Sequence, residues 1–375
     1  MRKTPAILVG IVLLLLALGI VMLASASSVK GSDVYKDSHY FLIRQLIWLA
    51  LAVTAGGVTA SIDYHQWKRW WIPLTAIAVV LLIVVLGCHK INGSHRWMRI
   101  GPISVQPSEF AKFALVIMMS VWMAGVGSKA GTFLHGIIKP GLLLALLLGP
   151  VFLEPDFGTT VLLAAVGCAI MFAGGCSPRP LIAGVVVGAI LFAVAVHHDP
   201  VRAGRVLAFM EPEKYPKEAY HLQQSLQAFT LGGGWGVGLG ESLQKHAFLP
   251  EAHTDFILAI IGEELGMPAT LMVLLLFAGF LGCGMAISFQ APDMFGRLLG
   301  LGYTLMTTVQ AAINMGVVTG CLPTKGLALP FISYGGSSLI VSMMCVGVLI
   351  NIARQGVVTE DRAVHQAVRD KTRWL

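Results

Sequence analysis

The sequence predicts an all-α integral membrane protein with about ten transmembrane helices and a long extracytoplasmic loop between helices 7 and 8. Hydrophobic residues make up 56% of the chain and charged residues only 12%, whereas about 25% of the residues are charged in a typical soluble domain. Apolar runs of roughly 17–22 residues recur along the chain, and each is long enough to cross the hydrocarbon core of a bilayer. The basic residues, in addition, are distributed unevenly between alternate connecting segments.

Ten apolar segments, separated by Gly, Pro and charged residues, are candidates for membrane-spanning helices. The eighth is longer than a bilayer requires, and we expect it to be broken near Gly266 and Pro268. The predicted spans are Pro5–Ala24, Phe41–Ser61, Trp71–Gly87, Ser108–Gly125, Lys139–Leu153, Gly158–Gly174, Leu181–Val196, Phe256–Ser288, Gly296–Thr319 and Phe331–Ile352.

The distribution of Lys and Arg orients these helices. With the N-terminus in the cytoplasm, the inner segments hold roughly twice as many basic residues as the short outer loops, as the positive-inside rule requires. Arg96 and Arg99, in an outer loop, oppose this trend. We therefore expect a cytoplasmic N-terminus and C-terminus. Residues 1–353 then form the membrane domain, with residues 197–255 as its long outer loop, and residues 354–375 form a cytoplasmic tail.

The six cysteines are scattered along the chain without a paired spacing. Most of them lie within or beside apolar runs, where a free thiol behaves as a small hydrophobic residue. We therefore expect neither a disulfide framework nor a metal site built from cysteine.

Ionisable residues near the predicted spans gather at the extracytoplasmic end. Such residues are costly at membrane depth, so their positions indicate function. Glu109 and Lys112 lie three residues apart on one helix face, where they can pair. Six separate segments reach this level, and they carry Arg44; Glu109 and Lys112; Glu154 and Asp156; Glu251, His253 and Asp255; Glu263 and Glu264; and Lys325 with the stretch Ser333–Ser338.

The outer loop from His197 to Asp255 is the main irregular region predicted, and a loop of this length in a compact bundle indicates a functional role. Its stretch Gly232–Gly240 is rich in glycine but does not stand between a strand and a helix, as a dinucleotide-binding loop would. Two interpretations stay open. The stretch is either a flexible or tightly turning segment, or a backbone cradle for a phosphate-bearing head group.

Several longer motifs resemble one known family. They are Gln106–Lys112 (QPSEFAK), Glu154–Thr159 (EPDFGT), Phe248–Phe256 (FLPEAHTDF), Ile261–Gly266 (IGEELG), Leu322–Gly326 (LPTKG) and Leu329–Ser338 (LPFISYGGSS). In their residues and in their order along the chain, these motifs resemble those of the SEDS family (shape, elongation, division and sporulation). Glu241–Lys245 and Asn351–Gln355 are more similar to the division branch, FtsW, than to the elongation branch, RodA, and both branches stay open.

The resemblance implies a peptidoglycan glycosyltransferase of the cytoplasmic membrane. Such an enzyme polymerises lipid II, a disaccharide-pentapeptide on undecaprenyl pyrophosphate, at the outer membrane face and releases undecaprenyl pyrophosphate. The implied partners are a class B penicillin-binding protein, other divisome proteins and membrane lipid, with no nucleic acid; the implied location is the division septum. Two other classes stay open, a lipid II flippase and a non-catalytic divisome scaffold.

The resemblance also assigns roles to residues. Asp255 is the expected catalytic base, because a carboxylate within hydrogen-bond reach can take the proton of the acceptor hydroxyl. The alternative for Asp255 is a helix N-cap. Arg44 and Asp156 are expected to form a structural ion pair, and a divalent cation, Mg or Mn, is a possible cofactor without a predicted protein site. The expected substrate-binding residues are Glu109, Lys112, Arg44, Lys245, His253, Glu263, Lys325 and Ser337.

Overall fold

The computed structural model describes residues 3–372 except 89–94, 102, 247–248 and 250. The side chains of residues 34, 100, 103, 200–202 and 358–372 also lie outside the described set. Phe248 and Pro250 of the motif Phe248–Phe256 are therefore outside the described residues.

Helices dominate the described part of the chain, and a single short hairpin of β1 (Met98–Ile100) and β2 (Ile103–Val105) interrupts them. The helices are α1 (Thr4–Lys30), α2 (Tyr40–Ser61), α3 (Trp67–Leu86), α4 (Pro107–Val126), α5 (Lys139–Leu153), α6 (Phe157–Ala173), α7 (Pro178–His197), α8 (Pro200–Met210), α9 (Pro216–Gly232), α10 (Ile257–Phe289), α11 (Met294–Val318) and α12 (Gly336–Thr372).

Every predicted span coincides with a helix. Among the described residues, eight helices are long and apolar enough to cross a membrane, and α6 is a shorter apolar helix. The break in the eighth span is also present, because Gly266 has non-helical backbone angles (φ 73°, ψ −167°) inside α10. The predicted start of the last span at Phe331 was wrong. Helix α12 begins at Gly336, and the preceding residues form turns in which Phe331 has a φ of 67°.

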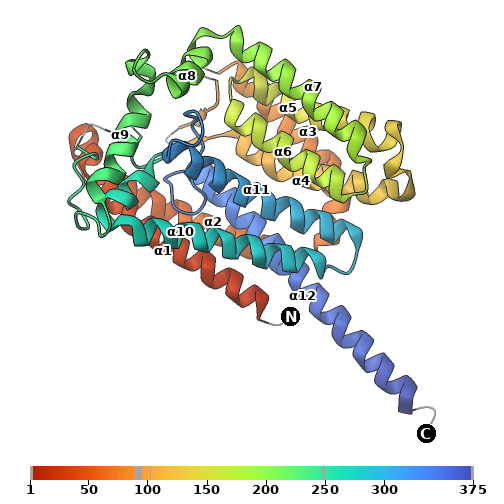
Figure 1. Ribbon diagram of the computed structural model, residues 1–375. Helices are drawn as coiled ribbons and strands as arrows, with labels where there is room; N and C mark the ends of the chain where they lie inside the picture. The colour runs from red at the N-terminus through yellow and green to blue at the C-terminus, as the bar shows by residue number, and fades with distance from the viewer. Residues whose placement is uncertain (1–2, 89–94, 102, 247–248, 250, 373–375) are drawn as a thin grey trace.

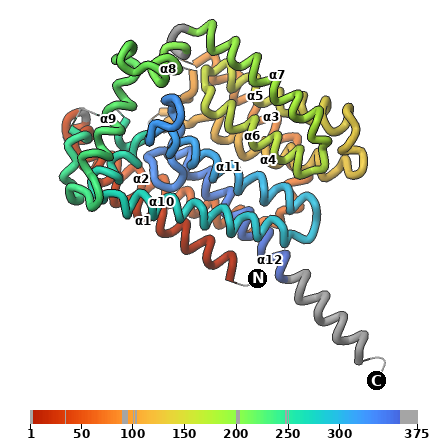
Figure 2. The backbone as a smooth tube through the Cα atoms, in the orientation of Figure 1, coloured from red at the N-terminus to blue at the C-terminus, as the bar shows by residue number. Residues whose placement is uncertain are grey.

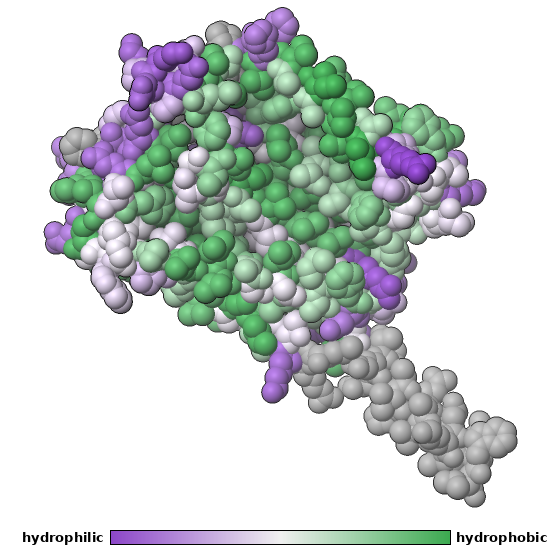
Figure 3. All heavy atoms as spheres, viewed as in Figure 1, coloured by the Kyte–Doolittle hydropathy of each residue, from purple (hydrophilic) through white to green (hydrophobic). Residues whose placement is uncertain are grey.

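The helices differ greatly in how deeply they are buried. In the most apolar part of α4, 61% of the residues are buried, whereas none are buried in the corresponding part of α7. Helix α4 packs against α3, α5, α6 and α11, and α10 packs between α1 and α11. Helix α7 runs along the edge of the bundle (Figure 1). Hydrophilic side chains gather at two opposite ends of the visible face, with a mainly apolar surface between them (Figure 3). This division is the pattern that a bilayer-spanning protein requires.

The long loop is more regular than predicted. It contains α8 and α9, and the backbone passes through both helices before α10 begins (Figure 2). Helix α9 packs along α10, and the Ser225 hydroxyl donates a hydrogen bond to the Val318 carbonyl at the end of α11 (2.7 Å). The expectation of an irregular loop was therefore wrong, because α9 buries one face against the bundle and gains helical structure from that packing.

The glycine-rich stretch packs against the kink of α10. Its backbone N–H groups at Val237 and Gly238 donate to the carbonyls of Glu263 (2.9 Å) and Glu264 (3.0 Å), which the break at Gly266 leaves free of helical partners. A Cβ at Gly236 would lie 2.3 Å from the Glu264 carbonyl oxygen, and its φ is 82°. Two of its N–H groups therefore serve the fold, which favours a tightly turning segment over a phosphate cradle.

Candidate active site

Asp255 lies where four separate segments meet at one end of the bundle. Its backbone carbonyl accepts a hydrogen bond from the side-chain amide of Asn314 in α11 (2.7 Å). The Asn314 amide also donates to the Leu327 carbonyl (2.6 Å). A Cβ at Gly326 would lie 2.9 Å from Asp255 Oδ2 and 3.9 Å from Arg96 Nη1. A side chain at this position would push the carboxylate aside, so Gly326 allows the carboxylate to approach this segment closely.

The Asp255 carboxyl is partly exposed and chemically perturbed. Burial and the charge of Glu251 raise its pKa to about 7, Arg96 opposes that rise, and Asp156 adds to it. The alternative role as an N-cap was wrong, because Phe256 occupies the N-cap position of α10 without a side-chain cap. Among the described contacts, no hydrogen bond reaches the Asp255 carboxylate. A carboxyl with a pKa near 7 and a free oxygen suits a general base at neutral pH.

For Asp156, the structure describes another partner than the predicted Arg44. The ion pair that the structure describes for Asp156 is with Arg96, whose Nε lies 3.8 Å from Asp156 Oδ2. Arg96 also donates to the Pro155 carbonyl. Asp156 caps α6 by accepting from the Thr159 N–H (3.1 Å). Arg44 instead lies over the Tyr40 ring, 4.6 Å from its centroid.

Arg96 belongs to a cluster of buried charges. Its side chain is only 22% exposed, and its Nε has no hydrogen-bond partner among the described residues. Glu154 is fully buried with both carboxyl oxygens unpartnered there, so burial and Asp156 raise its pKa to about 8 while Arg96 opposes the rise. Burial lowers the pKa of the half-buried Lys325, and Asp156 counteracts this. The site thus combines a basic carboxylate with two nearby cations, Arg96 and Lys325.

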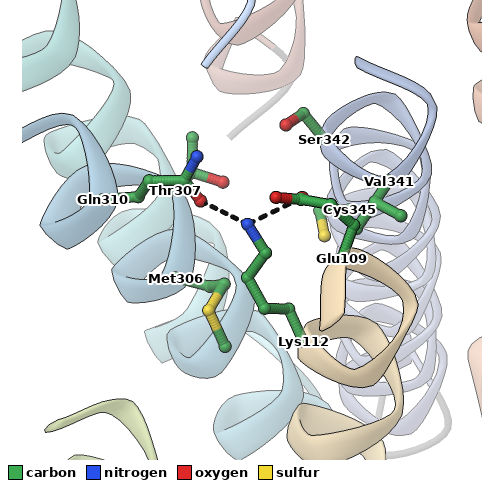
Figure 4. A pocket seen from close by; sticks show the side chains of 8 residues that line it. All are labelled: Glu109, Lys112, Met306, Thr307, Gln310, Val341, Ser342 and Cys345. Atoms are coloured by element: carbon green, nitrogen blue, oxygen red, sulfur yellow. Dashed lines mark hydrogen bonds and ion pairs between the residues drawn. The ribbon is translucent and has the colours of Figure 1, made fainter. Parts of the chain in front are cut away.

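Glu109 and Lys112 form the predicted pair inside the bundle. Lys112 Nζ lies 2.7 Å from Glu109 Oε2 and donates to Gln310 Oε1 (2.7 Å), as Figure 4 shows. The pair lines a cavity of about 10 Å³, room for a single water. Asp255 does not line that cavity.

Helix α11 joins this pair to the Asp255 segment. Gln310 donates to the Ala328 carbonyl (2.8 Å), one helical turn from the point where Asn314 holds Asp255 and Leu327. The acids and bases therefore gather at one end of the bundle as predicted, but Lys112 is already bonded on both sides. This geometry favours its structural role over contact with substrate.

Two predicted substrate-binding residues anchor the loop instead. Glu263 is fully buried and accepts hydrogen bonds from the Ser242 hydroxyl and from the Leu243 N–H (2.8 Å). Lys245 pairs with Glu264 (3.1 Å), and both of these side chains are buried. These contacts favour a structural role for both residues, because each charge is neutralised or bonded inside the fold. Glu263 and Glu264, adjacent on α10, therefore both bind the loop that contains Ser242 and Lys245.

His253 and Ser337 also have structural contacts. The His253 ring lies 4.8 Å from the Phe41 ring centroid and 5.9 Å from that of Tyr334, and burial together with Lys30 lowers its pKa to about 4. The imidazole is therefore neutral at physiological pH. The Ser337 hydroxyl accepts from the Gln106 N–H (3.4 Å), which links the first turn of α12 to the start of α4.

The described residues do not form a cage for a divalent cation. No group of three or more His, Cys, Asp or Glu side chains in that part of the chain could hold a metal ion. Glu154 and Asp156 lie two residues apart, but both Asp156 oxygens are engaged with Thr159. The site residues therefore do not fit a preformed metal centre.

Sequence reasoning missed Arg96, Gln310 and Asn314. Arg96 carried a usable signal, because a basic residue that opposes the positive-inside trend has a reason to lie on the outer side. Gln310 and Asn314 are four residues apart in the apolar α11, and neutral amides in such a helix are candidates for interhelical hydrogen bonds. Neither amide belongs to a recognised motif.

Comparison with known proteins agrees with this architecture. The family model FTSW_RODA_SPOVE, described as "Cell cycle protein", matches residues 5–357. The "probable peptidoglycan glycosyltransferase FtsW" of Trichlorobacter lovleyi is 41% identical over 351 residues, covering 92% of each chain. The "stage V sporulation protein E" of Bacillus subtilis is 36% identical over 353 residues, covering 93% of this chain and 96% of that protein.

Two solved structures are also similar. A chain from a structure of polymerization and crosslinking by a peptidoglycan synthase complex matches with a TM-score of 0.79 and 28% identity, covering 93% of this chain and 97% of that chain. The rod shape determining protein RodA of Thermus thermophilus matches with a TM-score of 0.69 and 26% identity, covering 92% and 95%. With a family match across nearly its whole length, the chain belongs to the FtsW/RodA/SpoVE family of cell cycle proteins.

Proposed function

We propose that the protein is a peptidoglycan glycosyltransferase that polymerises lipid II, with Asp255 as its catalytic base. The observation that carries the proposal is the position of Asp255, a partly exposed carboxylate with a pKa near 7, beside Arg96. The relatives named peptidoglycan glycosyltransferases support the reaction class.

In the proposed reaction, Asp255 accepts the proton of the acceptor sugar hydroxyl as its oxygen attacks the anomeric carbon of the donor. The bond from that carbon to the lipid pyrophosphate breaks, and the pyrophosphate leaves with the bonding electrons. Arg96 and Lys325 are the cations we place opposite the developing negative charge, because fixed positive groups stabilise such a leaving group in a partly buried site. Any divalent cation would arrive with the pyrophosphate and would help to neutralise its charge.

We place the site at the extracytoplasmic face of the cytoplasmic membrane, with both termini in the cytoplasm. The start of α1 and the departing part of α12 leave the bundle at the same end, which supports this topology (Figure 1). The synthase complex among the similar structures supports a class B penicillin-binding protein as partner. Septal cell-wall synthesis is the proposed role, since relatives named FtsW share 37–41% identity with this chain.

The test is glycan polymerisation by the purified chain together with a class B penicillin-binding protein and labelled lipid II. The wild type should yield polymer and Asp255→Asn none, while both retain the same thermal stability. Asp33→Asn, which removes an exposed carboxylate near the same end, is the matched control and should keep full activity. Equal polymer from Asp255→Asn would remove Asp255 as the base. Transport of lipid II across vesicles without polymer would replace the enzyme by a flippase.

A further inference from the structure

A second cavity lies at the opposite end of the bundle from Asp255. It has a volume of about 450 Å³ and is lined by Trp71 of α3, by the last turns of α4 and by two short helices that follow α4. An α-helix rises about 1.5 Å per residue, so the cavity lies roughly 20 Å along α4 from Glu109. The lining residues are Trp71, Val121, Trp122, Gly125, Val126, Lys129 and His135.

The wall of this cavity is held by specific contacts. Gly127 has a φ of 54° and turns the chain sharply from α4 into the 3-10 helix Gly127–Gly131. The Trp122 indole N–H donates to the His135 carbonyl (3.3 Å), in the short helix Phe133–Ile138. The Thr132 hydroxyl donates to the Lys129 carbonyl (2.7 Å) and caps the second helix by accepting from the His135 N–H. The turn therefore brings Lys129 and His135 to the same opening as two indole rings.

The charge around this cavity has one sign. Between Phe113 and Leu153 the sequence contains no Asp or Glu, whereas Lys129 and Lys139 both fall in that range. Lys129 is exposed at the cavity. Two acids at this end contact nearby bases: Asp293 pairs with Lys68 (3.2 Å), and Asp63 lies against His65 (2.8 Å). The cavity therefore presents positive charge without an acidic neighbour on its own elements.

Apolar surface borders the same opening. Phe133 is 62% exposed and Leu134 49% exposed, and both directly precede His135 of the cavity wall in the same short helix. Indole rings and lysines are favoured where a membrane protein meets the headgroup layer, and exposed apolar residues face the acyl chains. A free anion would use only the charged part of this surface, whereas a phospholipid would use all of it.

We propose that this cavity binds the headgroup of an anionic phospholipid from the leaflet opposite the active site. Lys129 and His135 lie against the headgroup phosphate, the two indoles border the glycerol region, and the acyl chains run over Phe133 and Leu134. The site is separate from the proposed glycosyltransferase chemistry and does not depend on it.

The experiment compares binding of phosphatidylglycerol and phosphatidylcholine to the delipidated full chain by native mass spectrometry. Lys129→Gln removes the charge, and Arg179→Gln is its control, an exposed base at the start of α7 outside the cavity. Gly125→Leu fills the cavity without clash, because a Cβ there meets nothing within 4 Å. Gly57→Leu is the control on α2, with equally open space.

The wild type should retain phosphatidylglycerol in preference to phosphatidylcholine. Lys129→Gln should lower that preference about fivefold, the equivalent of about 1 kcal/mol for one base near an anionic surface, and Gly125→Leu should remove the bound lipid. Both controls should behave as the wild type. Equal losses in Lys129→Gln and Arg179→Gln would overturn the proposal, since general charge would then suffice. Displacement of the lipid by inorganic phosphate alone would overturn it as well.

Discussion

Replacing Lys112 by methionine tests how much the buried Glu109–Lys112 pair of α4 and its bond to Gln310 of α11 stabilise the bundle. Lys112 Nζ lies 2.7 Å from Glu109 and 2.7 Å from Gln310, and the side chains of the ion pair are 2% and 7% exposed. Lys112→Met leaves the Glu109 carboxylate buried without its cation, and breaking such a pair from one side costs about 3–5 kcal/mol. The double variant Glu109→Gln/Lys112→Met removes both charges and should recover most of that loss, because a neutral pair has no buried charge to compensate.

The assay is a double-mutant cycle on the free energy of unfolding, measured by denaturant titration in mixed micelles. A matched control exists in Lys214, which pairs with Glu211 at the same i,i+3 spacing (2.6 Å) but with side chains 72% and 51% exposed. Lys214→Met should change stability very little, since exposed pairs are screened by water. A loss in Lys112→Met no larger than in this control, or additive effects in the cycle, would refute the reasoning.

Two further predictions concern the stability of the fold at Glu154 and Gly236. The pKa of Glu154 is raised from 4.5 to about 8, so folding stability is full below pH 4.5 and falls as the pH rises towards 8. Glu154→Gln stays neutral and should therefore increase the free energy of unfolding at pH 7 by about 3 kcal/mol, with no gain in acid; an equal gain at both pH values would contradict this origin. Gly236→Ala should lower the melting temperature and loosen the loop, because a Cβ there meets the Glu264 carbonyl at 2.3 Å in a backbone with φ 82°. Gly234→Ala, where a Cβ meets nothing within 4 Å, is its control, and equal losses in both would show that the docking on α10 is not the cause.

The sequence predicted the helices well because the length of an apolar run is enough to identify a membrane-spanning helix. Each of the ten apolar segments became a helix, and the break at Gly266 was visible in the position of Gly and Pro. The start of α12 was misplaced because Phe331 is as apolar as a helix residue, whereas its φ of 67° depends on packing that hydropathy does not encode. The loop helix α9 was missed for a related reason, since its support comes from α10.

The sequence predicted which charged residues gather at one end of the bundle better than it predicted their pairings. The motifs brought Asp255, Glu109 and Lys112 to one end, and the spacing of three residues gave the Glu109–Lys112 pair. Pairing across segments was not predictable: Asp156 took Arg96 instead of Arg44. A single sequence does not determine which of several basic side chains in the outer loops pairs with a given acid, because the pairing depends on the geometry of those loops.

The most direct test of Asp255 as the base is the pH dependence of the initial polymerisation rate in the wild type and two variants. The rate should fall in acid with an apparent pKa near 7, because the base must be ionised and its pKa is about 7. Glu251→Gln should shift the profile to lower pH, since Glu251 raises the pKa of Asp255, and Arg96→Gln should shift it to higher pH, since Arg96 lowers it. A rate that stays constant through neutral pH, or a profile that moves in the same direction in both variants, would contradict the account.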